Sequence, residues 1–307
     1  MIGKLPDGNS VLNEYKPFAD VDFIVTDLDG TLTNSDTPIL EQIEKKIVYL
    51  KQMKVFTTIA TGRTYKGARK LIENLHVIDG MPIALYNGGI LLEHNRDNLI
   101  AMCTIPFYAV ERILEIIGIN SAGIYIYTFD MSIQDLHELL EPYHIKEEVY
   151  YTGYKCVQID VNGTRVKPLN MDRIKNQNIL SILLQRSELS EIVYDRLMFF
   201  FESEMMVDYT DSGSGFVEVK GALHNKGIII SELKKRERVS KYKANKILAI
   251  GDNDNDLDLL KIADISVVVA NSSATAIEYA DYVCANESAE GFLDMLTVIQ
   301  RAKRYFK

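Results

Sequence analysis

Two short acidic motifs carry residue types suited to phosphoryl chemistry. Asp27 and Asp29 stand two residues apart just before a glycine, and Asp252 and Asp256 follow another glycine far along the chain. Carboxylates at positions i and i+2 of an extended segment point to the same side, so Asp27 and Asp29 can face one pocket. Four carboxylates in one place repel one another unless a cation compensates for their charge. We therefore predict Mg²⁺, a cation that binds oxygen ligands, at this site.

A hydroxyl group and a lysine add the features of a phosphate site. Thr61 offers a hydrogen-bond donor, and the adjacent Gly62 lets the backbone approach an anion closely. Asn225 is predicted to cap a helix with Lys226 in its first turn, which is the unfavourable end of the helix dipole for a cation. A charge that breaks a local rule in this way is a functional candidate. Together with Mg²⁺ and the carboxylates, these groups predict a site for a phosphoryl dianion.

Buried strands are expected to position these groups. The apolar runs that predict core strands lie at residues 23–26, 55–60, 82–86, 246–250, 265–269 and 282–284. Such short, β-branched runs are typical of a parallel sheet, and helical patterns alternate with them, so the sequence predicts an α/β fold. Ligands bind at the carboxyl edge of such sheets. Asp27 and Thr61 follow directly after predicted strands, and Asp252 follows one glycine after another. All three would lie at that edge.

Each of these strand ends also has a simpler interpretation. Asp and Gly are favoured at any strand-to-turn junction, and Thr61 fits an ordinary turn before a helix. Asn87 could line the same edge, but Asn-Gly is a common turn dipeptide, and we favour the turn. Residues 252–256 resemble the start of an EF-hand loop, but Leu257 and Ala263 replace its glycine and final glutamate. The combination of strand ends, rather than any one of them, therefore favours a catalytic site.

Composition excludes several classes of protein. The chain has 307 residues and 47% hydrophobic content, enough for two domains, and its net charge of -9 argues against a nucleic-acid partner. Its apolar runs are shorter than the roughly 20 residues that span a bilayer, so no membrane association is expected. Three widely spaced cysteines, Cys103, Cys156 and Cys284, predict free thiols and a cytoplasmic location. The histidines show no ligand spacing, which argues against zinc.

The pattern of elements predicts an insertion in the middle of the chain. Residues 1–20 are polar and are interpreted as an N-terminal extension. Residues 21–105 and 216–307 carry the candidate site and are predicted to form the catalytic core. Residues 106–215 mix strand and helix patterns without a catalytic combination, and are predicted to form an inserted α+β domain.

Within the predicted insertion, individual elements follow from periodicity. The pattern predicts a helix around residues 136–140, a strand over 154–161 and a helix over 189–201. The Gly-x-Gly at residues 213–215 does not lie between a strand and a helix, so we interpret it as a connection and not as a dinucleotide-binding motif.

The chain resembles the haloacid dehalogenase (HAD) superfamily, and in particular its Cof-type phosphatases with a large α/β cap. Four motifs occur in the expected order: Asp27-Leu28-Asp29-Gly30-Thr31, Thr61-Gly62-Arg63, Lys226-Gly227 and Gly251-Asp252-Asn253-Asp254-Asn255-Asp256. The resemblance implies a Rossmann-like, doubly wound parallel sheet with the insertion as its cap domain. The chain departs from the family pattern at two points. Asp27 lies unusually far from the N-terminus, and Ser272 follows Asn271 where alanine is common.

The resemblance also implies roles for the carboxylates. Asp27 would attack phosphorus as the nucleophile and form an aspartyl phosphate. Asp29 would act as general acid and base. Mg²⁺ would be held by the carboxylates of Asp27 and Asp252 and by the backbone carbonyl of Asp29.

Further residues would bind the phosphoryl group or support the site. Thr61 and the Gly62 amide would hold phosphoryl oxygens, and Lys226 would offset negative charge. By the same resemblance, Asn255 would lie at the phosphate, and Asp256 would support the metal and the lysine.

The predicted function is Mg²⁺-dependent hydrolysis of small phosphorylated metabolites, with sugar phosphates favoured. The same motifs would serve a phosphomutase, in which the aspartyl phosphate is shielded from water. A non-catalytic regulator that binds phosphometabolites would be expected to lack a catalytic residue, and none is missing here.

Overall fold

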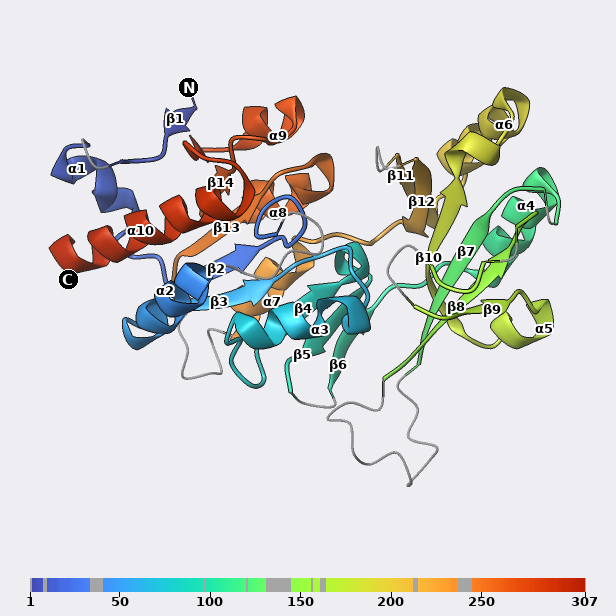
Figure 1. The fold of residues 1–307 in the computed structure, drawn as a ribbon, viewed down its shortest axis with the longest axis horizontal. Coiled ribbons are helices and arrows are strands. Elements are labelled where there is room, and N and C mark those ends of the chain that lie inside the picture. Colours follow the sequence, from blue (N-terminus) through green and yellow to red (C-terminus); the bar gives the residue numbers. More distant parts are fainter. Residues whose placement is uncertain are drawn as a thin grey trace. The chain divides into compact units, whose positions relative to one another are not determined.

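The computed structural model describes most of the chain and divides it into two compact units. The described residues are 2–7, 10–33, 41–95, 98–119, 121–130, 145–155, 157–160, 164–211, 215–236 and 245–306. The first unit contains residues 1–63, 68–100 and 225–307, and the second contains residues 64–67 and 101–224. The second unit is thus mainly an insertion in the sequence of the first. Figure 1 labels the elements of both.

A six-stranded sheet forms the centre of the first unit, and its strands all pair in parallel. In spatial order they are β1 (Gly3–Lys4), β15 (Tyr282–Val283), β14 (Ile265–Val268), β13 (Ile247–Gly251), β2 (Phe23–Thr26) and β3 (Phe56–Ile59). Strands β2, β13 and β14 are buried along their whole length, as expected for parallel strands covered on both faces. The predicted α/β fold with a parallel sheet is therefore confirmed.

The helices of the first unit connect and cover these strands. They are α1 (Leu12–Tyr15), η1 (Lys16–Phe18), α2 (Glu41–Gln52), α3 (Tyr65–Asn74), η2 (Tyr86–Gly88), α7 (Ile228–Arg236), η4 (Asp254–Asp256), α8 (Leu257–Ile262), α9 (Ala274–Tyr279) and α10 (Ser288–Phe306). The first turn of α3 is counted with the second unit. In the described part of the chain, no helix has the length and apolar character needed to cross a membrane.

The order of the strands creates a switch point between β2 and β13. These strands are neighbours, yet the chain leaves β2 through α2 toward β3 and leaves β13 through α8 toward β14, in the opposite direction across the sheet. Because such connections are right-handed, α2 and α8 lie on opposite faces. Ligands of doubly wound sheets bind where the strand order reverses in this way. The carboxyl ends of β2 and β13 therefore mark the expected site.

Two segments differ from the core that the sequence predicts. The segment expected as an N-terminal extension supplies edge strand β1, and Phe18 is fully buried with its ring 5.0 Å from that of Tyr282. Strand β4 (Pro82–Leu85), expected in the core sheet, instead forms a separate three-stranded sheet with β5 (Ile90–Glu93) and β6 (Leu99–Met102). A single bridge between Ala60 and Ala84 joins β4 to the end of β3.

The second unit is built on one mixed, mostly antiparallel sheet. Its strand order is β11 (Val207–Asp211), β12 (Phe216–Gly221), β10 (Asn178–Gln185), β7 (Ile124–Asp130), β8 (Lys146–Thr152) and β9 (Val166–Pro168), and only β8 and β9 pair in parallel. The other elements are α4 (Phe107–Ile117), α5 (Met171–Ile174), η3 (Arg186–Glu188) and α6 (Glu191–Ser203). Helices α4 and α6 pack side by side (Figure 1). Their buried side chains join those of the sheet in one core.

Two local predictions differ from the structure, and a third falls on residues that the structure does not describe. The strand predicted over residues 154–161 is wrong for the described residues, which form only a bridge at Ile159, whereas strand β8 was missed. The helix predicted around residues 136–140 lies outside the described residues. Lys226 precedes α7 and does not belong to its first turn, because the chain is still in a turn at that point.

Candidate active site

The two acidic motifs meet at the switch point of the sheet. Asp27 follows directly after β2, and its amide donates a hydrogen bond of 3.0 Å to the carbonyl of Ile250 in β13. Asp252 follows directly after β13. The ladder between the two strands, in which Thr26 pairs with Ile250, therefore sets both carboxylates side by side at the carboxyl edge.

A buried lysine joins the first and last acidic residues of the site. The ammonium group of Lys226 lies 2.7 Å from Oδ1 of Asp27 and 2.7 Å from Oδ1 of Asp256. All three side chains are almost fully buried. A lysine in this position is stable because two carboxylates accept its hydrogen bonds and balance its charge.

A close backbone contact fixes the loop that carries Lys226. Gly88 has a φ of +87°, and a Cβ there would lie 2.2 Å from the carbonyl oxygen of Asn225. Only glycine fits such an approach without strain. The turn after β4, which is the predicted Asn87-Gly88 turn, thus holds Asn225 and the adjacent Lys226 in place.

Asp256 is held by the backbone of its own motif. Its Oδ2 accepts hydrogen bonds from the amides of Asp252 (3.0 Å) and Asn253 (3.1 Å), so both oxygens of this carboxylate are engaged. Asp252 in turn accepts a hydrogen bond of 2.9 Å from the hydroxyl of Thr31. The motif therefore orients Asp252 and uses Asp256 to support Lys226.

The charges of the carboxylate cluster favour binding of a cation. Carboxylate oxygens of Asp27, Asp252 and Asp256 lie within 4.8 Å of one another. Burial raises the pKa of Asp27 to about 8, with Lys226 opposing and the other two aspartates reinforcing the rise. Burial and the neighbouring Asp256 raise the pKa of Asp252 to about 6. When all three carboxylates are ionised, one lysine does not neutralise them, so the donor set fits a divalent cation that prefers oxygen.

Asp29 is more exposed than Asp27 and pairs with an arginine. Arg63 donates through Nε to Oδ2 (2.8 Å) and through Nη2 to Oδ1 (2.5 Å), a two-point contact between guanidinium and carboxylate. Gly30, with a φ of +83°, brings this segment so close to Asp252 that a Cβ would lie 2.2 Å from its Oδ2. The sequence placed Arg63 in a motif but did not predict its contact with Asp29.

Thr61 and Gly62 lie at the end of the neighbouring strand β3. Thr61 is fully buried, and its hydroxyl accepts a hydrogen bond of 3.1 Å from the Arg63 amide. Gly62 is exposed, and a Cβ there would lie 3.1 Å from the side-chain amide of Asn87. That amide accepts a hydrogen bond of 3.2 Å from Asn255. Asn87 thus connects the Thr61-Gly62 turn to the second acidic motif, in addition to forming the predicted turn.

Comparison with known proteins identifies the family. The haloacid dehalogenase-like hydrolase family matches residues 24–296. This chain belongs to that family. It is 22% identical to the 5-amino-6-(5-phospho-D-ribitylamino)uracil phosphatase YitU of Bacillus subtilis, and the match covers 95% of this chain and 99% of YitU. The fold matches a haloacid dehalogenase-like hydrolase from Bacteroides thetaiotaomicron (TM-score 0.69, 20% identity, 92% of this chain and 99% of that one) and a HAD/COF-like hydrolase from Plasmodium vivax (0.68, 19%, 95% and 98%).

These matches confirm the predicted family and fold, and they support a phosphatase in general terms. The roles of individual residues stay predictions. All eight predicted site residues belong to the first unit, and the contacts described above join Asp27, Lys226, Asp252 and Asp256 directly.

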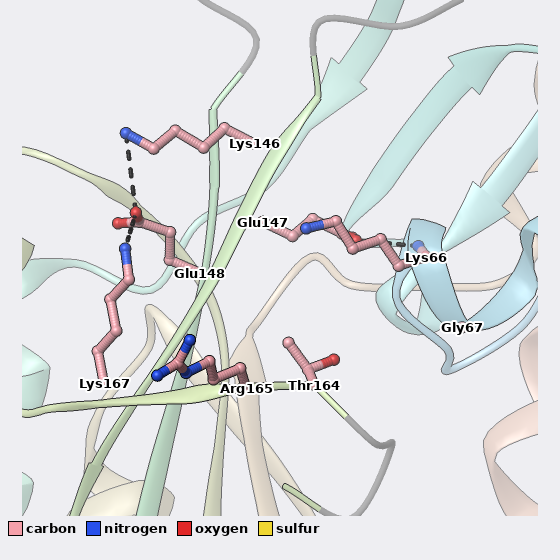
Figure 2. Close-up of a pocket in the computed structure, with 8 residues that line it drawn as sticks. All are labelled: Lys66, Gly67, Lys146, Glu147, Glu148, Thr164, Arg165 and Lys167. Atoms are coloured by element: carbon pink, nitrogen blue, oxygen red, sulfur yellow. Dashed lines mark hydrogen bonds and ion pairs between the residues drawn. The ribbon is translucent and has the colours of Figure 1, made fainter. Parts of the chain in front are cut away.

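The second unit of this HAD hydrolase contains a charged pocket that the sequence did not indicate. Its volume is about 620 Å³. It is lined by Lys66, Gly67, Lys146, Glu147, Glu148, Thr164, Arg165 and Lys167 (Figure 2). The carboxylate of Glu147 accepts hydrogen bonds from the amides of Tyr65 (2.7 Å) and Lys66 (2.9 Å).

Glu148 is the most heavily bonded carboxylate of this pocket. It accepts hydrogen bonds from Tyr150 (2.5 Å), Gln177 (3.0 Å), Arg173 (3.2 Å) and Lys167. Burial alone would raise its pKa, but these donors outweigh burial and hold the pKa at about 2. Glu147 and Glu148 are adjacent in a strand and therefore point to opposite sides. Their contacts are with residues far away in the sequence, so spacing along the chain did not indicate them.

Proposed function

We propose that this protein is a Mg²⁺-dependent phosphatase that hydrolyses small phosphorylated metabolites, sugar phosphates among them, in the cytoplasm. The observation that supports this best is the pair of 2.7 Å contacts from Lys226 to Asp27 and Asp256 beside Asp252. A buried carboxylate whose one oxygen is fixed by a lysine, next to a second carboxylate able to bind a cation, is suited to attack on phosphorus.

Asp27 is the nucleophile in this mechanism. Its oxygen attacks phosphorus while the bond from phosphorus to the leaving oxygen breaks, which gives an aspartyl phosphate. Asp29 donates its proton to the leaving oxygen and then accepts a proton from the water that attacks the aspartyl phosphate. Inorganic phosphate leaves, and Asp27 is regenerated. Because Arg63 contacts both oxygens of Asp29, this pair has to open before Asp29 can act.

Groups other than the two catalytic aspartates bind the phosphoryl oxygens. The Thr61 hydroxyl and the Gly62 amide donate hydrogen bonds to them, and Lys226 offsets charge on Asp27 and on the transferred group. Asn255 approaches the same oxygens, and Asn87 positions it through their 3.2 Å hydrogen bond.

Mg²⁺ would be held by Asp27 and Asp252 and, by family resemblance, the backbone carbonyl of Asp29. When bound, the ion supplies positive charge that offsets the carboxylates and polarises the phosphoryl group. Asp256 is less suited as a ligand, because Lys226 and two backbone amides already occupy its oxygens.

The substrate class rests on the relatives and on composition. The Bacillus subtilis relative is named for a substrate with a phosphorylated ribityl chain, which is a polyol phosphate. The net charge of -9 disfavours polyanionic nucleic acids as substrates. Both points support small phosphate esters.

A panel of phosphometabolites tests the proposal. Purified protein with Mg²⁺ is expected to release inorganic phosphate from several sugar and polyol phosphates, ranked by kcat/KM, and EDTA is expected to abolish release until Mg²⁺ is restored. No release from any member of a broad panel would refute the proposal. Isomerised sugar phosphate formed without free phosphate would instead support a phosphomutase.

A further inference from the structure

Helix α6 of the second unit has apolar side chains on two opposite faces. Leu197 and Phe201 are buried in the core of the unit. Phe199 and Ile192 lie on the other side and are 74% and 68% exposed. A surface helix normally has one apolar face and one polar face. The second apolar face of α6 is therefore unusual for a surface that contacts only water.

A groove runs along this exposed face between α4 and α6. Its volume is about 610 Å³. It is lined by Arg112, Glu115, Ile116, Asp195, Arg196, Phe199, Phe200 and Ser203. Arg112 and Glu115 form an ion pair with each other at 2.9 Å. Asp195 and Arg196 are exposed, and neither forms an ion pair with any residue that the structure describes.

Four residues of α6 form one continuous stripe. Ile192, Asp195, Arg196 and Phe199 are spaced by three, four and seven positions, which places them on the same face of a helix. The stripe is symmetric about its centre in chemical character. Its two ends are apolar, and its middle holds one anion and one cation.

We propose that this stripe and the adjoining groove form a two-fold symmetric interface with a second copy of this chain. If the axis crosses α6 between Asp195 and Arg196, an antiparallel copy of the helix places each Asp195 opposite Arg196 of the other copy. The same operation places each Ile192 opposite Phe199, because these residues are equally distant from the axis. One operation thus pairs every member of the stripe.

The pattern of charges favours a second copy over an unrelated partner. An acidic partner surface would match Arg196 but repel Asp195, and a basic surface would do the opposite. A two-fold contact satisfies both, since the same patch faces itself. Ile192 would project from one copy onto Phe199 at the edge of the other copy's groove, so the buried aromatic and aliphatic side chains would supply most of the affinity.

Charge reversal tests this geometry directly. The wild-type chain is expected to sediment as a dimer at micromolar concentration, and Phe199→Ser is expected to raise the dimer dissociation constant at least about tenfold. Asp195→Arg alone sets cations against cations, and Arg196→Asp alone sets anions against anions, so each single variant is expected to be monomeric. The double variant restores opposite charges and is expected to dimerise again.

Mixing the two single variants gives the sharpest test. One chain then presents two cations and the other two anions at the centre of the stripe, so an equimolar mixture is expected to form heterodimers. Glu278→Arg, an equal charge change in exposed α9 of the other unit, is the control and should leave the dimer intact. Unchanged far-UV circular dichroism spectra and phosphate release show that the variants are folded. A wild-type monomer, a dimer that survives both single reversals, or a mixture that stays monomeric would each overturn the proposal.

Discussion

The ammonium group of Lys226 lies 2.7 Å from Oδ1 of Asp27, a residue 199 positions earlier in the chain. The same ammonium group is equally close to Asp256. Burial lowers the pKa of a lysine, but the two carboxylates outweigh burial and raise the pKa of Lys226 above its ordinary value. Lys226 is therefore charged, and it serves both stability and the proposed chemistry.

Lys226→Met should destabilise the first unit strongly. The substitution leaves two carboxylates buried without their cation, which costs about 3–5 kcal/mol of unfolding free energy. Urea unfolding in the presence of EDTA measures this loss without compensation by a bound metal. Lys234→Met is the matched control, because the pair of Lys234 and Asp264 is partly exposed and is worth less than about 1 kcal/mol. Equal losses for both variants would contradict the role of Lys226.

Asp27→Asn should abolish phosphate release while keeping the fold. The amide is close in size to the carboxylate but is too weak a nucleophile to form the covalent intermediate, so kcat should fall by at least about a thousandfold. Steady-state phosphate release measures the effect, and the far-UV circular dichroism spectrum should match that of the wild type. Turnover within about tenfold of the wild type would remove Asp27 as the nucleophile.

Gly30→Ala should lower both stability and activity. The added Cβ would lie 2.2 Å from Oδ2 of Asp252, and alanine is strained at a φ of +83°. We expect a loss of about 2–4 kcal/mol and a lower apparent affinity for Mg²⁺, because Asp252 has to move. Thermal unfolding and Mg²⁺ titration of activity measure the two effects.

Gly215→Ala separates backbone strain from the clash. Gly215 has nearly the same φ, +85°, but apart from its chain neighbours no atom of the described residues lies within 4 Å of its would-be Cβ. Its substitution should therefore cost only the backbone term of about 1 kcal/mol and leave Mg²⁺ dependence unchanged. Equal losses of stability and equal Mg²⁺ dependence in both glycine variants would show that the close contact between Gly30 and Asp252 does not matter.

The parts of the site that follow strand ends could be predicted from the sequence. Asp27 and Asp252 come directly after buried apolar runs, and parallel strands bring their carboxyl ends to one edge. Lys226 was found because a cation is unfavourable before a helix, although the helix starts later than predicted. Strand periodicity and helix electrostatics depend on nearby residues alone, so both can be predicted from a single sequence.

Contacts between distant turns could not be predicted. Asn87 meets Asn255 because two separate turns converge, and Arg63 reaches Asp29 across the ends of two strands. No periodic pattern encodes either approach. The same holds for strand β4, whose apolar run resembles a core strand but pairs with β5 in a separate sheet. Pairing is set by the geometry of neighbouring segments, which local propensity does not contain.

Glu148 should make the second unit sensitive to acid. Its pKa in the folded protein is about 2, below its ordinary value of 4.5, because hydrogen bonds from Lys167, Tyr150 and Gln177 overcome the effect of burial. A depressed carboxylate pKa stabilises the fold above pH 4.5, and this stabilisation is lost as the pH falls from 4.5 toward 2. At pH 7, Glu148→Gln should therefore be less stable than the wild type by about 1–3 kcal/mol.

The difference between wild type and Glu148→Gln should shrink as the pH falls. Calorimetric unfolding at a series of pH values from neutral down to the lowest at which both proteins fold measures this convergence. Glu73→Gln is the control, because the pair of Glu73 and Arg69 is exposed and should contribute less than about 0.5 kcal/mol at any pH. A stability difference for Glu148→Gln that stayed constant across this range would show that the charge of Glu148 does not hold its four donors in place.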